Sequence, residues 1–142
     1  MKISTRGQYS LEALLCLATA ASEKPYSIHT IAETTHISDG YLEQLFIPLK
    51  KAGFITGSRG VQGGYKLAKD PKEIVIYQVL DLMETSLHTI PCLNGSECPN
   101  SDFCGSKAVW ECVESSIEKI MRTVTLADLI ETYNRLQGDS VG

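Results

Sequence analysis

Two short helices, each preceded by a serine, are the feature that most constrains the fold of this 142-residue chain. Ser27 and Ser38 stand immediately before Ile28–Thr34 and Asp39–Lys51, two segments whose apolar residues recur at helical spacing. A serine hydroxyl at such a position can accept a hydrogen bond from an amide of the first helical turn. Only residues 35–38 separate the segments, so the sequence predicts two helices joined by a tight turn, a helix-turn-helix.

A glycine-rich β-hairpin is expected directly after the second helix. Phe54–Thr56 and Tyr65–Leu67 are short runs of strand-forming residues, and the sequence GSRGVQGG connects them at positions 57–64. Its glycines can adopt positive φ angles and leave room for a phosphate to approach the backbone closely. A helix-turn-helix followed by such a hairpin predicts a mainly α, winged helix-turn-helix fold.

The remaining helices divide the chain into a first domain and a C-terminal part. Apolar periodicity predicts helices from Ser4 or Thr5 to about Ala21, over Ile76–Glu84, over Gly105–Thr123 and over Leu126–Leu136. From this order we expect a winged helix-turn-helix domain at 1–80, the end of a helix and a cysteine-bearing loop at 81–104, a long dimerisation helix and a final helix at 105–137, and a flexible tail at 138–142.

Charge is distributed unevenly along the chain. Residues 1–80 contain nine Lys and Arg against seven Asp and Glu, whereas residues 81–142 contain four against ten. A basic front part with an acidic rear part is typical of a DNA-binding domain joined to a regulatory or dimerising part. No apolar run approaches the ~20 residues of a membrane span, and Glu12 interrupts the segment that resembles a signal peptide. We therefore expect a cytoplasmic protein with no membrane partner.

Three cysteines stand at equal intervals in a stretch rich in Gly, Pro, Asn and Ser. Five residues separate Cys92 from Cys98, and five more separate Cys98 from Cys104. Thiolates are the ligands that soft metal centres prefer, and a loop of this composition allows three of them to converge. The spacing favours an iron–sulfur cluster over structural zinc, whose ligands are usually about two to four residues apart. The remaining alternatives are a thiol switch without metal and three incidental cysteines that have no joint role.

Several segments of the chain resemble the IscR-type family of bacterial winged-helix transcription regulators. They are MKISTRGQYSLEALL, SDGYLEQLFIPLKKAGFI, RGVQGGYKL and TLADLI, so the resemblance extends from Met1 to about Tyr133. It implies a homodimer, in which a long helix of each subunit crosses the other, and a palindromic double-stranded DNA operator. In cluster-binding members of the family the matching cysteines hold an iron–sulfur cluster, which implies a 2Fe–2S cluster here, with 4Fe–4S as an alternative.

The start of the second helix of the helix-turn-helix is the expected DNA-reading segment. Backbone amides near Gly40 and Tyr41, together with the Ser38 hydroxyl, suit a phosphate. Gln44 can pair with adenine, and Glu43 can accept a hydrogen bond from cytosine. In a regulator like IscR the residue at the Glu43 position is implicated in choosing between operator classes, and the resemblance implies the same role here. Each side chain alone is equally compatible with a solvated helix surface.

The hairpin and several basic side chains complete the expected DNA contacts. Arg59 stands between glycines with little to pack against, whereas a narrow minor groove attracts such a side chain. Gly63 and Gly64 are expected to let the backbone approach a phosphate. Sequence-independent attraction to phosphates is expected from Lys2, Arg6 and Lys50.

The chain departs from IscR-like proteins at the fourth cluster ligand. Those proteins have a histidine three residues after the third cysteine, whereas this chain has Lys107, and a protonated lysine cannot bind iron. The resemblance offers Glu12 of the partner subunit instead, because some family members borrow a ligand from the partner's first helix. His88 is the main local candidate, beside Asp102 and Glu111, and the sequence leaves the fourth ligand unassigned.

Two other functions are compatible with parts of this pattern. A cluster-free repressor of cysteine or sulfur metabolism, responding to thiol oxidation or to a partner protein, would share the fold, although that branch typically lacks the three cysteines. A small iron–sulfur electron-transfer protein would use the cysteines but would leave the helix-turn-helix and hairpin unexplained. The sequence contains no phosphate-binding loop and no base–nucleophile pair, so we expect a protein that is not an enzyme.

Overall fold

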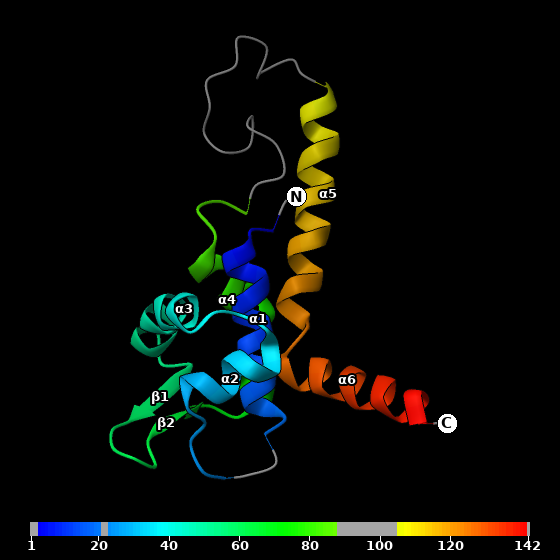
Figure 1. Ribbon diagram of the computed structural model, residues 1–142. Helices are drawn as coiled ribbons and strands as arrows, with labels where there is room; N and C mark the ends of the chain where they lie inside the picture. Colours follow the sequence, from blue (N-terminus) through cyan, green and yellow to red (C-terminus); the bar gives the residue numbers. More distant parts are fainter. Residues whose placement is uncertain (1–2, 21–22, 88–104, 142) are drawn as a thin grey trace.

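The computed structural model describes residues 3–20, 23–87 and 105–141, and within these ranges the chain is mainly helical (Figure 1). The described part contains one sheet, of two strands. In chain order the elements are α1 (Thr5–Ala18), α2 (Ile28–Thr35), α3 (Asp39–Lys51), β1 (Ile55–Ser58), β2 (Gly64–Leu67), the 3-10 helix η1 (Pro71–Glu73), α4 (Ile76–Met83), α5 (Gly105–Thr123) and α6 (Leu126–Val141). This order confirms the predicted winged helix-turn-helix.

Serine caps begin three helices, and those at Ser27 and Ser38 were predicted. Ser4 Oγ accepts a hydrogen bond from the Gly7 amide at 3.2 Å, and Ser27 Oγ accepts one from the Thr30 amide at 3.1 Å. Ser38 Oγ accepts one from the Tyr41 amide at 3.3 Å. Each bond satisfies an amide that has no partner inside its own helix, so local sequence alone fixes where these helices start.

Two helix ends differ from the prediction. α1 ends at Ala18 and not near Ala21, and its C-cap is Thr19, whose amide and hydroxyl both donate to the Leu15 carbonyl, at 2.9 Å and 2.8 Å. α6 continues past Leu136, where its end was expected, to Val141. It passes through Gly138, since one glycine lowers helix stability by only about 1 kcal/mol and does not stop a helix.

The hairpin is more closely paired than predicted. In the antiparallel register Ile55 lies opposite Leu67, and Ser58 lies opposite Gly64. Gly57, Ser58 and Gly64 therefore belong to the strands, and the expected connection at 57–64 is wrong at both ends. The tight connection stabilises the longer strands, because the Gly63 amide donates to the Gly60 carbonyl at 2.9 Å.

A segment before α2 pairs with the outer side of the hairpin. The Tyr26 amide donates to the Tyr65 carbonyl at 2.8 Å, and the Tyr65 amide donates back to Tyr26 at 2.7 Å. Gly64, with φ of +155°, lies beside this bridge, and a Cβ there would collide with the Tyr26 carbonyl. Glycine at this position is therefore required for the hairpin to reach the segment that leads into α2.

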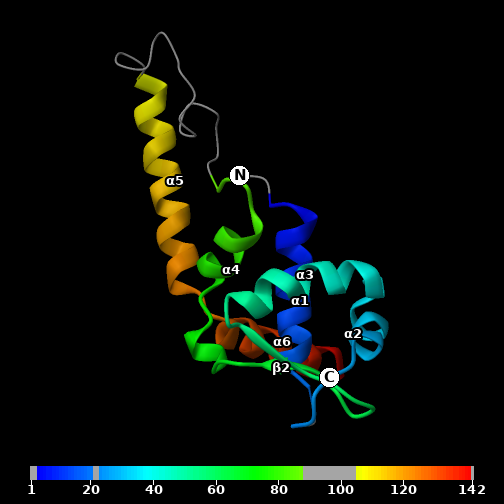
Figure 2. The ribbon, with the colours of Figure 1, turned by 90° about the vertical axis from the view of Figure 1, so that its left-hand side faces the viewer.

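One hydrophobic core holds the helix-turn-helix, the hairpin and the C-terminal part together. α1 runs through its centre and packs against α2, α3, α4, α6 and β2 (Figure 2). Leu14 of α1, Phe46 of α3 and Leu126 of α6 are all buried to within 1% of complete burial. The domain boundary expected at residue 80 lies inside α4, whose Val79 and Met83 belong to the same core.

α5 is a long helix beside this core, and α6 extends away from the C-terminal end of α5, here called its base (Figure 1). The base is fixed to α4, since the Ile76 amide donates to the Val124 carbonyl at 2.9 Å and the Leu126 amide donates to Ile74 at 2.8 Å. Arg122 lies 3.8 Å from the centre of the Tyr77 ring. None of the residues of α5 is fully buried. No helix in the described ranges is both long and apolar enough to cross a membrane.

Candidate nucleic-acid interface and metal site

The turn between α2 and α3 is held on both sides. His36 ends α2 in the left-handed conformation, with φ of 59°, and its amide donates to the Ala32 carbonyl at 2.8 Å. Ile37 follows as a buried anchor with 5% of its surface exposed. On the outside, the His29 ring lies 3.3 Å from the Glu33 carboxylate and 3.7 Å from that of Asp39. These contacts fix the direction in which α3 leaves the turn.

The outward face of α3 is open. Gly40, Glu43 and Gln44 are exposed, and nothing lies within 4 Å of a Cβ built on Gly40. Among the described residues, the side chains of Glu43 and Gln44 have no hydrogen-bond or ion-pair partner. The Ser38 oxygen accepts the Tyr41 amide, which leaves its O–H free to donate. The start of α3 therefore presents unpaired polar groups of the kind that hydrogen-bond to DNA.

Tyr41 differs from its neighbours on α3 because it is half-buried. Its ring meets the Tyr9 ring of α1 edge to face, with 5.7 Å between the centres and 87° between the planes. This geometry favours aromatic pairs and restricts the side chain to one position. Sequence reasoning missed Tyr9, because its partner lies on another helix and no local pattern marks the contact.

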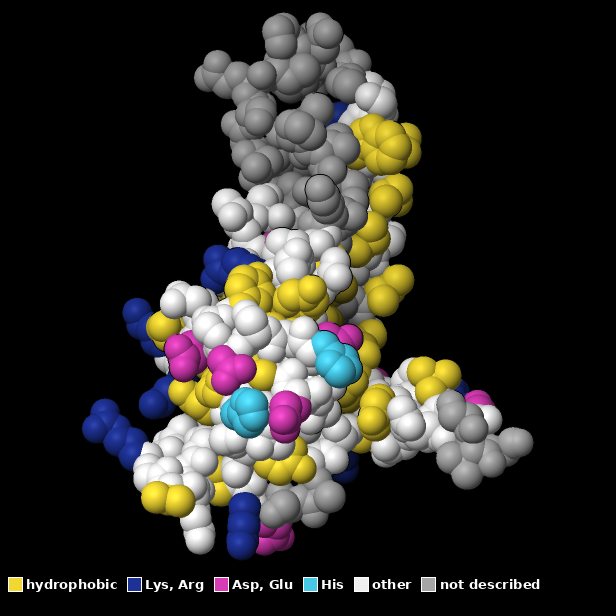
Figure 3. Space-filling model, in the orientation of Figure 1, with side chains coloured by type: hydrophobic (Ala, Val, Ile, Leu, Met, Phe, Trp, Pro, Cys, Tyr) yellow, Lys and Arg dark blue, Asp and Glu magenta, His cyan; other side chains and the backbone are white. Residues whose placement is uncertain are grey.

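Basic side chains gather on the side of the molecule that carries α3 and the hairpin (Figure 3). Lys50 is exposed, and its Nζ lies 3.5 Å from a Cβ built on Gly57 of β1. Arg59 is exposed in the connection of the hairpin, and Arg6 is exposed on the first turn of α1. Lys2 lies outside the described residues. A cluster of cations beside an open helix face suits a polyanion.

Gly63 and Gly64 have a reason in the fold that the sequence did not indicate. A Cβ on Gly63 would collide with the Ser58 carbonyl across the hairpin connection. Gly64 is needed for the bridge to Tyr26. The two glycines therefore shape the hairpin that carries Arg59, and the expected approach of a phosphate is an additional role that stays a prediction.

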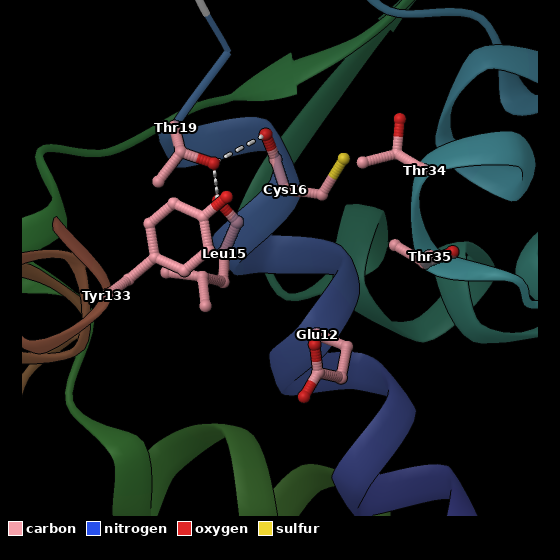
Figure 4. A pocket seen from close by; sticks show the side chains of 7 residues that line it. All are labelled: Glu12, Leu15, Cys16, Thr19, Thr34, Thr35 and Tyr133. Atoms are coloured by element: carbon pink, nitrogen blue, oxygen red, sulfur yellow. Dashed lines mark hydrogen bonds between the residues drawn. The ribbon is translucent and has the colours of Figure 1, made fainter. Parts of the chain in front are cut away.

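Glu12, the candidate cluster ligand on α1, is exposed at the edge of a cavity of about 160 Å³ between α1, α2 and α6 (Figure 4). Cys16 lines the same cavity, but its sulfur points toward Thr34 and away from the Glu12 carboxylate. Burial raises the pKa of the Cys16 thiol, which keeps it protonated and unreactive at neutral pH. Cys16 and Glu12 are therefore not arranged to share a metal ion.

The end of α4 is tied to the start of α1 by Glu84. Glu84 Oε1 accepts hydrogen bonds from the Ser4 amide at 2.9 Å and from the Ser4 hydroxyl at 2.8 Å. The same oxygen occupies the space that a side chain on Gly7 would need. A carboxylate is favourable here, because the first turn of a helix carries partial positive charge. The cysteine segment follows Glu84 in the sequence, so this contact joins its beginning to α1.

This contact predicts an unusual response to glycine replacement. Glu84→Ala is expected to lower the free energy of unfolding by roughly 1–3 kcal/mol, because it removes two hydrogen bonds to a charged group. Gly7→Ala is also expected to destabilise the protein, although alanine normally stabilises a helix interior, since its Cβ would displace the carboxylate. Asp81→Ala, which removes an exposed carboxylate from α4, is the control and should leave the free energy of unfolding nearly unchanged. Equal urea midpoints for Gly7→Ala and the wild type would contradict this geometry.

The three spaced cysteines and His88 lie outside the described residues. Elsewhere, in 3–20, 23–87 and 105–141, no group of three or more His, Cys, Asp and Glu side chains could hold a metal ion. Cys92, Cys98 and Cys104 stay the predicted ligands, and three thiolates fit iron–sulfur chemistry. Lys107, on the first turn of α5, is half-buried and adds no ligand. Glu12 is exposed on α1.

The chain matches the model of the Rrf2 family, described as iron-dependent transcriptional regulator, over residues 3–132. It is 32% identical over 136 residues to the HTH-type transcriptional regulator IscR of Serratia proteamaculans, covering 96% of this chain and 83% of that protein. The structure of T. potens IscR matches with a TM-score of 0.79 and 36% identity, covering 96% of this chain and 91% of that one.

A regulator named for a different role has nearly the same structure. CymR, the global cysteine regulator of B. subtilis, matches with a TM-score of 0.78 and 31% identity, covering 93% of this chain and 98% of that one. The family match runs from α1 into α6, and the proteins named are regulators and not enzymes. The chain therefore belongs to the Rrf2 family of transcriptional regulators.

Proposed function

We propose that this protein is a homodimeric regulator that binds a palindromic DNA operator and responds to an iron–sulfur cluster held by Cys92, Cys98 and Cys104. The observation that carries the proposal is the equal spacing of these cysteines between α4 and α5 of a winged helix-turn-helix. A DNA-binding protein has no need of three thiols in one short segment unless they report on something. Its place of action would be the cytoplasm, where thiols stay reduced.

DNA would be read by the outward face of α3. With the start of α3 in the major groove, Gln44 would pair with adenine and Glu43 would accept from cytosine while repelling a misplaced phosphate. Ser38, Gly40 and Tyr41 would position the helix through phosphate contacts. Two features support this role of α3: its outward face is exposed, and the turn before it is held in one conformation.

The hairpin and the surrounding cations would supply the second set of contacts. Arg59 would enter a narrow minor groove, and the backbone near Gly63 and Gly64 would lie against a phosphate. Lys2, Arg6 and Lys50 would add attraction that is independent of sequence. The exposure of Arg59, Arg6 and Lys50 supports these roles.

A dimer is supported by the two faces of α5. Ile117 and Met121 are half-buried toward the helix's own subunit, whereas Val109, Val113 and Ile120 are 58%, 38% and 63% exposed. These apolar side chains form a line along the outer edge of α5 in Figure 3. A soluble surface rarely carries such a line unless another protein covers it. The crossing of two α5 helices would bury it.

The surface that would receive the partner's helix lies between α1 and α6. A groove of about 340 Å³ there is lined mainly by apolar side chains, including Leu11, Leu15, Leu129 and Leu136. Gln8 and Glu12 lie in the same groove. If the partner's α5 and the cysteine segment before it occupied this groove, Glu12 would be near enough to complete the partner's cluster.

An iron–sulfur cluster would act as the sensing group, because it assembles when iron is supplied and is lost on exposure to oxidants. Cys92, Cys98 and Cys104 would hold it, and the fourth ligand would be Glu12 of the partner subunit or His88, since Lys107 cannot ligate. A 2Fe–2S cluster is the first choice and 4Fe–4S the second. An oxygen ligand binds iron less tightly than a thiolate, which suits a sensor.

The chain's own contacts offer a route from the cysteine segment to the DNA-reading helix. Glu84 precedes the segment and binds Ser4 at the start of α1. Tyr9, one turn further along α1, packs against Tyr41 at the start of α3. A change at the cysteines that moved Glu84 would therefore shift α1 and, through the Tyr9–Tyr41 contact, the start of α3.

A second candidate is a cluster-free regulator that reads thiol oxidation or a partner enzyme. The similarity to CymR, which is named as a cysteine regulator, favours it. The two candidates differ in metal content: the first contains iron and sulfide after anaerobic purification, and the second contains neither. An electron carrier, the third possibility on sequence grounds, would show no sequence-specific DNA binding.

DNA binding is tested by Arg59→Ala on an operator selected from random DNA. We expect a loss of about 30-fold or more in affinity, because one base or phosphate contact is worth roughly 1–3 kcal/mol and a dimer loses two of them, at least about 2 kcal/mol in all. The slope of affinity against salt should also become shallower. Arg135→Ala, an exposed arginine on α6, is the control. Equal affinity of the Arg59 variant and the wild type would remove the hairpin from the interface.

A further inference from the structure

We propose that Ile47 reads DNA sequence by an apolar contact with the 5-methyl group of a thymine in the major groove. This inference rests on the proposed DNA-binding function and adds a specificity residue to it. Thymine and cytosine differ at the major-groove edge in two ways: thymine has a carbonyl acceptor and a methyl group, and cytosine has an amino donor. An apolar side chain at the right depth therefore distinguishes thymine without any hydrogen bond.

Ile47 is the exception among the large aliphatic and Phe residues of α3. Leu42, Leu45, Phe46 and Leu49 are all at most 1% exposed, whereas Ile47 is 64% exposed. Single exposed apolar residues are common on protein surfaces, so exposure alone carries no argument. The position of this residue on the helix is what gives the exposure meaning.

Ile47 lies on the same face of α3 as the expected DNA-reading residues. Gly40, Glu43, Gln44 and Ile47 are spaced at i, i+3, i+4 and i+7, which places them along one side of a helix. This side is opposite to the four buried residues. Ile47 is about 10 Å along the axis from Gly40, a length of roughly three base pairs at 3.4 Å each. It would therefore meet a different base from those that Glu43 and Gln44 read.

The residues around Ile47 favour close contact with DNA. Gly40 has no side chain, and nothing lies within 4 Å of a Cβ built there, so the helix is able to approach the groove closely. Lys50 and Lys51, in the last turn, are exposed and able to pair with phosphates beside it. Isoleucine is also stiff in a helix, because its branched Cβ leaves one strongly preferred rotamer. Little side-chain freedom is lost when it is fixed against a base.

The inference is tested by a double-mutant cycle between protein and DNA. Operators are first selected from random double-stranded DNA by the wild type and by Ile47→Ala. We expect the variant to lose its preference for thymine at one position in each half-site and to keep the others. That thymine is then replaced by deoxyuridine, which removes only the methyl group. Each change alone should weaken binding by about 3- to 10-fold per half-site, and the two together no more than either alone.

Two controls separate this contact from other effects. Lys51→Ala should weaken binding to the thymine and uracil operators equally, because it acts on phosphates. Ile47→Ala should unfold at the wild-type temperature, since its side chain is exposed. An unchanged selected sequence for Ile47→Ala, or additive effects in the cycle, would overturn the inference while leaving the proposed function intact. If the wild type itself selects no sequence, the proposed function fails first.

Discussion

Cys98→Ala is expected to yield a protein that, after anaerobic purification, contains no iron or sulfide and shows no visible charge-transfer absorption. The reason is the number of ligands: the chain offers three thiolates in one segment, and losing one leaves too few to hold a cluster. Absorption spectroscopy with iron and sulfide analysis measures the result. In the same protein, DNA affinity should become independent of iron supply and of oxidants.

The matched control is Cys112→Ala. Cys112 is also a free cysteine, exposed on α5 and eight residues beyond Cys104, and it is outside the equal spacing. It should keep the full absorption of the wild type. Spectra of Glu12→Ala and His88→Ala beside these two then identify the fourth ligand. A wild type without iron whose DNA affinity still changes on thiol oxidation would contradict the cluster and establish the cluster-free candidate.

Ile120→Asp is expected to convert the dimer into monomers. The substitution would place a carboxylate at the C-terminal end of the apolar line formed by Val109, Val113 and Ile120. Burying an unpaired charge in an interface costs roughly 3–5 kcal/mol, which is more than about a hundredfold in the dissociation constant of the dimer. Sedimentation velocity across a range of concentrations measures it. Affinity for a palindromic operator should fall as the dimer is lost, because a monomer binds only one half-site at a time.

Ser115→Asp tests whether any added charge on α5 has this effect. Ser115 is exposed and polar, and its position on the helix is away from the apolar line. This variant should remain dimeric. Both variants should keep the helical content of the wild type, since neither residue belongs to the core. A wild type that sediments as a monomer, or an Ile120 variant that remains a dimer, would refute the α5 interface.

Local features of the fold could be predicted from sequence because their causes are local. Ser4, Ser27 and Ser38 begin their helices through bonds to amides three residues away, so the cause of each helix start lies within four neighbouring residues. The hairpin was predicted from its glycines, but its strands are longer than predicted. The reason is that Gly64 serves a bridge to Tyr26, a residue far away in the sequence.

The ends of the helices also separate what local sequence predicts from what distant contacts decide. Thr19 is the C-cap of α1, and the helical periodicity of the sequence does not reveal that the helix ends there. The start of α4 depends on a bridge between Val75 and Thr125, which lie on segments that only the folded chain brings together. Neither Glu84 nor Tyr9 carried a signal in the sequence, since each acts through a distant partner.

The sequence by itself determined the winged helix-turn-helix, through helix caps, apolar periodicity and glycines, and it determined the equal spacing of the three cysteines. Only the tertiary structure decided which apolar residues are covered. Along α3 it buries Phe46 and leaves Ile47 exposed, and along α5 it leaves Ile117 half-buried and Ile120 exposed. The physical reason is that hydrogen bonds between neighbours are fixed by local geometry, whereas burial depends on which distant helix packs against which side.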